Sequence, residues 1–308
     1  MARHLHPLRA VARPSKRSDA SQADVGRSAR QLLRGVGGGL IIGLPLLFTM
    51  EMWFHSFLLS SWKIVVLLAV AFVIVIGYSA VSGFRRERTW GELLIDSVNT
   101  MGIAAVVAAL ALLLLGRIDG DTDLRDLIGK VALEMIPVAF GVSLAGTELA
   151  AGDGADDEDK EDRGSPAGDR PVGAFGRLFV AAGAALLFAL NIAPTEEPML
   201  LGVEAQPALL VLVVGASLAM TLAIVFYADF RGGSAPGTGD SALDHPLTET
   251  IAAYAVSLAV SFVLLWSFGR TDGASAAAIV GQSVMLAFVA SFGAAAGRLL
   301  VGGQVSER

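Results

Sequence analysis

Long apolar segments are the feature of this sequence that most constrains its fold. A helix needs about 20 apolar residues to cross a bilayer, and the chain has eight runs of that length. In hydrocarbon every backbone amide must be hydrogen-bonded within the protein, so each run is predicted to be an α-helix. The sequence therefore predicts an all-α membrane protein with eight transmembrane helices, over residues 35–55, 63–83, 97–116, 127–149, 175–194, 206–228, 249–268 and 277–299.

Composition agrees with this class and excludes several kinds of chemistry. Apolar residues make up 54% of the chain and charged residues only 17%. Without cysteine the chain cannot form disulfides, iron–sulfur clusters or thiol nucleophiles. No two of the four histidines share an element at metal-ligand spacing. We therefore expect neither a metal centre nor a cofactor.

Three segments lie outside the apolar runs. Residues 1–34 are rich in Arg, Ser and Ala, which predicts a disordered basic arm in the cytoplasm. Contact of this arm with anionic lipid is favoured over binding to nucleic acid. Residues 151–173 are charged and rich in Gly and Pro, which predicts an acidic flexible linker, and residues 302–308 form a short tail.

The basic residues predict the orientation of the chain. Eight spans place both termini on one side, and that side receives most of the 23 Lys and Arg residues. The opposite side receives only Lys63, Arg117, Arg125, Lys130 and Arg270. Loops rich in Lys and Arg stay in the cytoplasm, so both termini are predicted to be cytoplasmic in a bacterial inner membrane.

The first half of the apolar region recurs in the second half. The matching pairs are Glu51 with Glu197, Gly37 with Gly183 and Phe84-Arg85 with Phe230-Arg231 at an offset of 146, then Gly116–Gly120 with Gly269–Gly273 at 153, and Gly129 with Gly281 and Phe140-Gly141 with Phe292-Gly293 at 152. Each unit holds four spans, and an even number makes both copies enter the membrane in the same direction. The sequence predicts two parallel four-helix repeats, over residues 35–150 and 174–301.

Motifs for catalysis are missing. GTGD at 237–240 resembles an intramembrane aspartyl protease motif but lies in a loop, without a second aspartate inside a span. Asp119–Asp123 begins like a calcium loop, yet Leu124 and Lys130 stand where that loop needs Gly and Glu. HExxH, GxSxG and P-loop motifs do not occur. We therefore expect a protein that is not an enzyme.

Carboxylates in the outer half of the membrane are the main candidates for a site. Glu134 has apolar neighbours on both sides, and Pro137 frees a backbone carbonyl near it. Desolvated carboxylates that lie close together can hold and release a proton or a cation. The outer-half candidates are Glu134, Glu197, Glu51 and Glu196, and Asn191 could add a neutral oxygen. Glu148 is a further candidate on the cytoplasmic half, about four turns from Glu134 on nearly the same face of its span. The alternative is that several of these side chains sit in water where a helix ends, as the stretch NIAPTEEP at 191–198 would allow.

Three stretches, GLPLLFTMEMWFHSFLL, ALEMIPVAFGVSLAGTELA and NIAPTEEPMLL, resemble a bacterial family of integral membrane proteins known only as a domain of unknown function. The resemblance implies a multi-span inner-membrane protein and assigns no activity, partner or catalytic residue. From the residues themselves, a transporter or channel for a cation or a proton is the leading hypothesis. A non-transporting membrane scaffold or sensor is the alternative, and the oligomeric state is left open.

Overall fold

Helices account for every regular element in the described residues. The computed structural model describes residues 32–33, 35–81, 89–152, 174–230 and 245–302. After the helix Gly35–Leu47 come α2 (Met50–Leu58), α3 (Ser61–Val81), α4 (Trp90–Leu114), α5 (Leu124–Gly152), α6 (Ala174–Leu190), α7 (Glu197–Glu204), α8 (Pro207–Phe230), α9 (Pro246–Ser267) and α10 (Ala276–Gly302). The all-helical prediction is thereby confirmed.

Fewer of these helices qualify as membrane spans than the sequence predicted. Six are long and apolar enough to cross a membrane, namely α3, α4, α5, α8, α9 and α10. A seventh span results if the helix Gly35–Leu47 and α2, which meet at a bend of 74°, are taken together. The apolar part of α6, Gly176–Leu190, is shorter than the roughly 20 residues that a span needs. The first and fifth predicted spans are thus not straight, full-length helices.

Local chemistry explains both interruptions. At the first, Thr49 has an extended backbone (φ −83°, ψ 119°), and its hydroxyl donates to the Leu46 carbonyl at 2.7 Å. Such side-chain bonds offer the backbone an alternative to the helix. At the second, Pro194 follows the end of α6, and Pro198 stands in the first turn of α7. Because proline lacks an amide hydrogen, it favours the end or the start of a helix.

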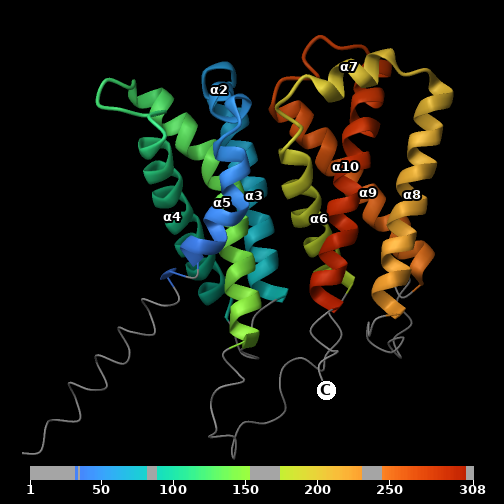
Figure 1. The fold of residues 1–308 in the computed structure, drawn as a ribbon, viewed down its shortest axis with the longest axis horizontal. Coiled ribbons are helices and arrows are strands. Elements are labelled where there is room, and N and C mark those ends of the chain that lie inside the picture. The colour runs from blue at the N-terminus through green and yellow to red at the C-terminus, as the bar shows by residue number, and fades with distance from the viewer. Residues whose placement is uncertain (1–31, 34, 82–88, 153–173, 231–244, 303–308) are drawn as a thin grey trace, which may run out of the picture.

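The helices form two groups, which lie side by side in Figure 1. The first half consists of the helix Gly35–Leu47 with α2 to α5, and the second half consists of α6 to α10. Within the second half, α10 contacts all four other helices, and α5 is the corresponding inner helix of the first half. Contact between the halves runs mainly through α3 and α6. The end of the molecule that carries α2 and α7 is called the α7 end below.

Close packing between the halves uses two glycines and two aromatic rings. A Cβ at Gly77 of α3 would collide with the Phe179 ring of α6, and one at Gly183 of α6 would collide with Tyr78 of α3. The Tyr78 hydroxyl also donates to the Val180 carbonyl at 3.2 Å. Small residues that let helices approach closely are the usual means of helix association in lipid.

Burial separates the inner helices from those that face lipid. Of the span in α5, 72% is buried within the protein, against 17% for α8. On α5, Val138 packs against Gly39 and Gly43 of the first helix, and Gly141 meets the Gly38 backbone. A polar side chain on the inner face of α5 is therefore shielded from both lipid and water.

Three predicted segments cannot be compared with the structure. The basic arm over residues 1–34 lies outside the described residues except for 32–33, and the acidic linker 151–173 lies outside them from residue 153 on. The same holds for the tail beyond Gly302.

Candidate functional site

Glu134 is the most deeply buried carboxyl group among the described residues. It lies in the span Leu124–Leu144 of α5 with an exposure of 0%. Neither of its carboxyl oxygens forms a hydrogen bond to another described residue. Burying such a group without a partner costs several kcal/mol in the charged form, so an ionisable side chain here indicates a function.

Two further charged residues continue from Glu134 toward the α7 end. Asp126, Lys130 and Glu134 are spaced four residues apart, which places them on one face of α5. The Lys130 ammonium lies 2.7 Å from the Asp126 carboxylate and donates to the Arg117 carbonyl at 2.8 Å. The Ser56 hydroxyl of α2 donates to Asp126 at 2.7 Å. Lys130 is thus bound to other groups, although it stands one turn from Glu134.

The other predicted carboxylates lie in wetter surroundings. Glu51, in the first turn of α2, is half-buried, whereas Glu196 and Glu197 at the start of α7 are exposed. The Thr195 side chain and nearby backbone amides, together with Arg270, lower the pKa of Glu197 below its usual value of 4.5. Glu197 is therefore ionised at neutral pH, which suits attraction of cations at the surface better than uptake of a proton.

Of the two remaining candidates, Asn191 does not join a site in the described structure, and Glu148 cannot be compared with it. Asn191 is exposed, and its side-chain amide donates to the Leu187 carbonyl of its own helix at 2.8 Å. The backbone of Glu148 continues α5, but its side chain lies outside the described residues. Within the described ranges no three His, Asp or Glu residues come together as metal ligands would. The structure hence does not gather Glu51, Glu134 and Glu197 into such a group.

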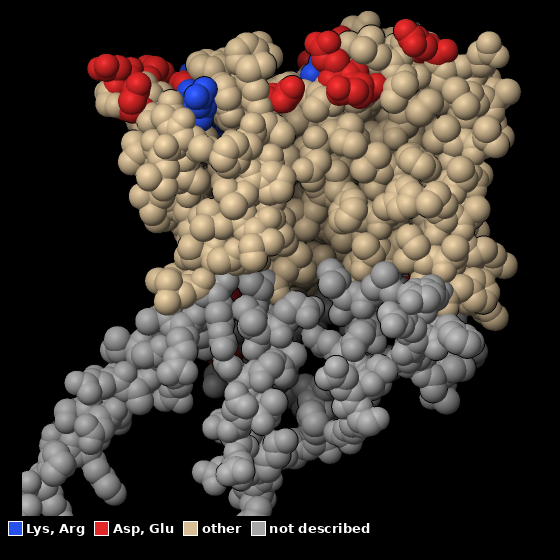
Figure 2. Space-filling view, viewed as in Figure 1, with Lys and Arg blue, Asp and Glu red and all other residues tan. Residues whose placement is uncertain are grey.

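Charge is distributed unevenly over the surface. On the face drawn in Figure 2, acidic residues gather at the α7 end, and the broad middle band shows neither acidic nor basic side chains. A band without charge is what a lipid-facing surface requires. Glu134, which is fully buried, contributes no charge to this surface.

A polar and aromatic contact joins the halves at the α7 end, and sequence patterns did not predict it. The Lys63 ammonium of α3 lies 2.7 Å from the Asp272 carboxylate, which belongs to the turn between α9 and α10. Beside this pair the Trp62 and Trp266 rings stack edge-to-face, with centroids 5.0 Å apart. The only signal was Lys63 itself, a charged residue at the start of an apolar run.

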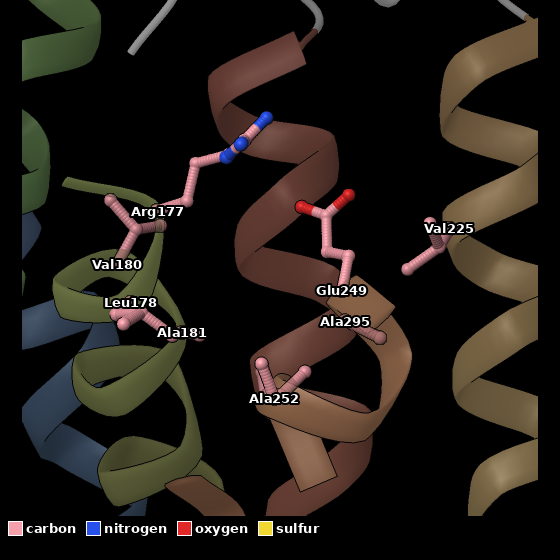
Figure 3. A pocket seen from close by; sticks show the side chains of 10 residues that line it. Arg177, Leu178, Val180, Ala181, Val225, Glu249, Ala252 and Ala295 are labelled. Atoms are coloured by element: carbon pink, nitrogen blue, oxygen red, sulfur yellow. The ribbon is translucent and has the colours of Figure 1, made fainter. Parts of the chain in front are cut away.

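A small pocket opens in the second half, at the end opposite α7. Arg177 of α6 and Glu249 of α9 line it together with alanines of α9 and α10 (Figure 3). Its volume is about 30 Å³, enough for a water molecule. Arg177 and Glu249 are 72 residues apart in the sequence, and no motif predicts that they line one pocket.

Comparison with known proteins identifies one family. The family described as "Putative integral membrane protein (DUF2391)" matches residues 31–301. Among curated proteins nothing matches the chain significantly. The same is true of solved structures.

Proposed function

Since the chain belongs to this family of integral membrane proteins, we propose that it carries a proton or a small cation across the lipid bilayer, with Glu134 as the binding group. The observation that supports the proposal is the complete burial of Glu134 inside a membrane span, with both oxygens unbonded. Intramembrane carboxylates usually mark an ion or proton path, because nothing in packing alone favours them.

We further propose that the membrane part consists of eight crossings arranged as two parallel four-helix repeats. In this arrangement α6 and the residues up to Pro194 form the fifth crossing. Close glycine contacts recur at positions related by the sequence offsets. Gly129 contacts Ser56 in the first half, and Gly281 contacts Gly202 in the second half. Likewise Gly141 contacts Gly38 in the first half, and Gly293 contacts Ala184 in the second half. Equivalent contacts in both halves support the repeat, and a repeated unit is a common plan of transporters.

The turn between the third and fourth helices of each half also supports the repeat. Gly116 and Gly269 both adopt a left-handed backbone, with φ of 64° and 74°. The carbonyl of the next residue accepts a side-chain hydrogen bond in each half, from Lys130 at 2.8 Å and from Gln282 at 3.1 Å. Lys130 and Gln282 are themselves matched at the offset of 152.

The proposed location is a bacterial inner membrane with both termini in the cytoplasm, supported by the sorting of Lys and Arg. The cysteine-free chain allows a direct test with single introduced cysteines. In intact cells a membrane-impermeant maleimide should label D121C but not S306C. The reverse labelling would invert the orientation.

Ion flux tests the transport proposal. The purified full chain is reconstituted in lipid vesicles that enclose a dye sensitive to pH, Na⁺ or K⁺, and a gradient of the same ion is imposed. We expect flux that falls at least tenfold in Glu134→Gln, because the amide cannot carry the charge. Glu204→Gln, an exposed carboxylate at the end of α7, serves as the matched control and should behave like the wild type.

Two outcomes would overturn this proposal. One is the absence of flux under every gradient, and the other is unchanged flux in Glu134→Gln. Either would favour the alternative, a membrane scaffold or sensor without transport. We propose no enzymatic activity, since the chain contains no catalytic motif.

A further inference from the structure

The first candidate membrane span is interrupted between the helix Gly35–Leu47 and α2. The helix Gly35–Leu47 ends, Phe48 and Thr49 leave the helical path, and α2 begins at Met50 after a bend of 74°. The last carbonyls and first amides of helices lack partners within the helix. Thr49 does not cap α2, because its hydroxyl donates back to the Leu46 carbonyl. The Leu44 and Leu46 carbonyls accept hydrogen bonds from the Phe48 and Thr49 amides, whereas the Leu47 and Phe48 carbonyls at the break accept no such bond from the described residues.

The packing of α5 against this span places Glu134 at the level of the interruption. Toward the α7 end, Gly129 of α5 touches Ser56 of α2, where an added Cβ would lie 3.0 Å from the Ser56 Cβ. Toward the opposite end, Val138 packs on Gly43. Gly129 thus contacts α2, and Val138 contacts the helix Gly35–Leu47. Glu134 lies between them on α5, on the part of that helix that passes the interruption.

Glu134 also lies on the face of α5 that packs against the first span. Asp126, which bonds to Ser56, and Val138, which packs on Gly43, are eight residues before and four residues after Glu134. Residues four apart lie on the same side of a helix, so all three side chains face the first span. A fully buried carboxyl group without a hydrogen bond thus stands beside the interrupted backbone.

The matching interruption in the second half is arranged differently. There the Arg270 guanidinium donates to the Pro194 carbonyl, and Leu286 occupies the position matched to Glu134. In the first half Arg117, matched to Arg270, instead stacks over the Trp53 ring, with its guanidinium carbon 4.9 Å from the ring centroid. A cationic side chain thus bonds to the backbone of the second interruption, and a leucine replaces the acid at the matched position. The first is faced by an acid.

We propose that Glu134 and the interrupted backbone at Leu47–Met50 form a binding site for one positive charge, either an alkali cation or a proton. The inference rests on the proposed function and names its binding site. The carboxylate supplies the negative charge, and the carbonyls that end the helix Gly35–Leu47 supply neutral oxygens at the negative end of a helix dipole. Interrupted helices hold cations in this way at the midplane of other transporters.

The charges on neighbouring elements are compatible with a single charge at this site. The helix Gly35–Leu47 has no charged residue, α2 contributes Glu51 and His55, and α3 contributes Lys63, which is bound to Asp272. On α4 the acids Glu92 and Asp96 lie in its first turns, near the opposite end, and on α5 Lys130 is bound to Asp126. Divalent cations usually require several carboxylate ligands, so one buried carboxylate favours a monovalent charge.

Binding can be measured without transport. The full chain in detergent is unfolded thermally in NaCl or KCl, with choline chloride keeping the ionic strength constant, and in MgCl₂. A bound alkali cation should raise the Tm in proportion to the logarithm of its concentration. Glu134→Gln should abolish this rise, and Glu204→Gln should retain it. If Glu134→Gln does not fold, Glu134→Asp replaces it, because the shorter side chain should weaken binding at least tenfold.

A second measurement distinguishes a proton from an alkali cation. Infrared difference spectra between acidic and alkaline pH show the C=O stretch of a carboxyl group that gains a proton. A titrating band that is missing in Glu134→Gln, without a Tm response to Na⁺ or K⁺, identifies the proton as the bound charge.

The proposal is overturned if neither the Tm response nor the band depends on Glu134. It is also overturned if Mg²⁺ stabilises the wild type more than Na⁺ and K⁺ do and Glu134→Gln abolishes that effect. Binding that persists in the absence of vesicle flux would refute the transport function and leave the site standing.

Discussion

The Lys63 ammonium lies 2.7 Å from the Asp272 carboxylate, and this ion pair ties α3 of the first half to the α9–α10 turn of the second half. Its two members differ in exposure, since the Lys63 side chain is 9% exposed and the Asp272 side chain 67%. Losing the partner charge therefore costs more free energy for the buried lysine than for the exposed aspartate.

Removing the Asp272 carboxylate should weaken the contact between the two halves. Asp272→Asn leaves a buried ammonium without its counter-charge, and we expect a loss of about 1 kcal/mol in the free energy of unfolding. The exposure of Asp272 keeps the loss well below that of a fully buried pair. Unfolding in mixed micelles measures it, with Asp121→Asn in the exposed α4–α5 turn as the control. Equal stability of the two variants would contradict the prediction.

Replacing Glu134 by leucine should make the protein more stable while abolishing the proposed ion flux. Leucine is the residue at the matched position 286, and it removes a buried polar group that has no hydrogen bond. We expect a gain of about 1–3 kcal/mol in the free energy of unfolding. Leu286→Glu, the reverse exchange in the other half, should lose a comparable amount. A clear loss of stability in Glu134→Leu would mean that the carboxyl group has a structural partner.

Close approach of α10 to α6 should make Gly293 sensitive to any side chain. A Cβ at Gly293 would collide with the Ala184 carbonyl, and backbone cannot yield as a side chain can. We expect Gly293→Ala to cost about 1–3 kcal/mol. Gly215 of α8 has open space around it, so Gly215→Ala should be neutral or slightly stabilising. A smaller effect at Gly293 than at Gly215 would contradict the packing.

Stability at low pH should depend on the turn between α4 and α5. The Thr122 hydroxyl and the Asp121 amide bond to the Asp119 carboxylate and lower its pKa below the usual 3.8. A group whose pKa is lower in the folded state contributes its stability above the unfolded value, and the contribution is lost as the pH falls through the folded value. Thr122→Val should bring the pKa of Asp119 back toward 3.8.

The carboxyl ¹³C shift of labelled aspartate measures this change. Thr271→Val, in the matching turn of the second half, should leave the shift of Asp119 as it is in the wild type. A pKa of Asp119 that does not move in Thr122→Val would show that the hydroxyl does not stabilise the carboxylate.

Most helix positions could be predicted from hydropathy, because an apolar segment in lipid must hydrogen-bond its own backbone and therefore forms a helix. The starts of α8, α9 and α10 differ from the predicted ones by only a few residues. For α4 the prediction began at residue 97, whereas the helix begins at Trp90. Its first turns carry Glu92 and Asp96, and a Thr89 cap fixes its start. Hydropathy marks the apolar part of a helix, whereas caps and charges decide where it begins.

The interruptions and the contacts between halves could not be predicted in this way. Hydropathy does not change at Phe48 and Thr49, so it cannot show that the helix ends there. The helix ends at a local hydrogen bond of Thr49. Lys63 and Asp272 are 209 residues apart, and only the folded chain brings them together. Glu134 could be selected in advance because a carboxyl group between apolar neighbours is costly wherever the helix packs.

The edge-to-face contact of Trp62 and Trp266 lets circular dichroism report on the interface between the halves. The chain has only four tryptophans, and these two belong to different halves with ring centroids 5.0 Å apart. Indoles at that separation couple electronically and produce a paired circular-dichroism band that vanishes once they part. A rocking of one half against the other, which would open the α7 end, could thus be followed in real time in the unlabelled protein.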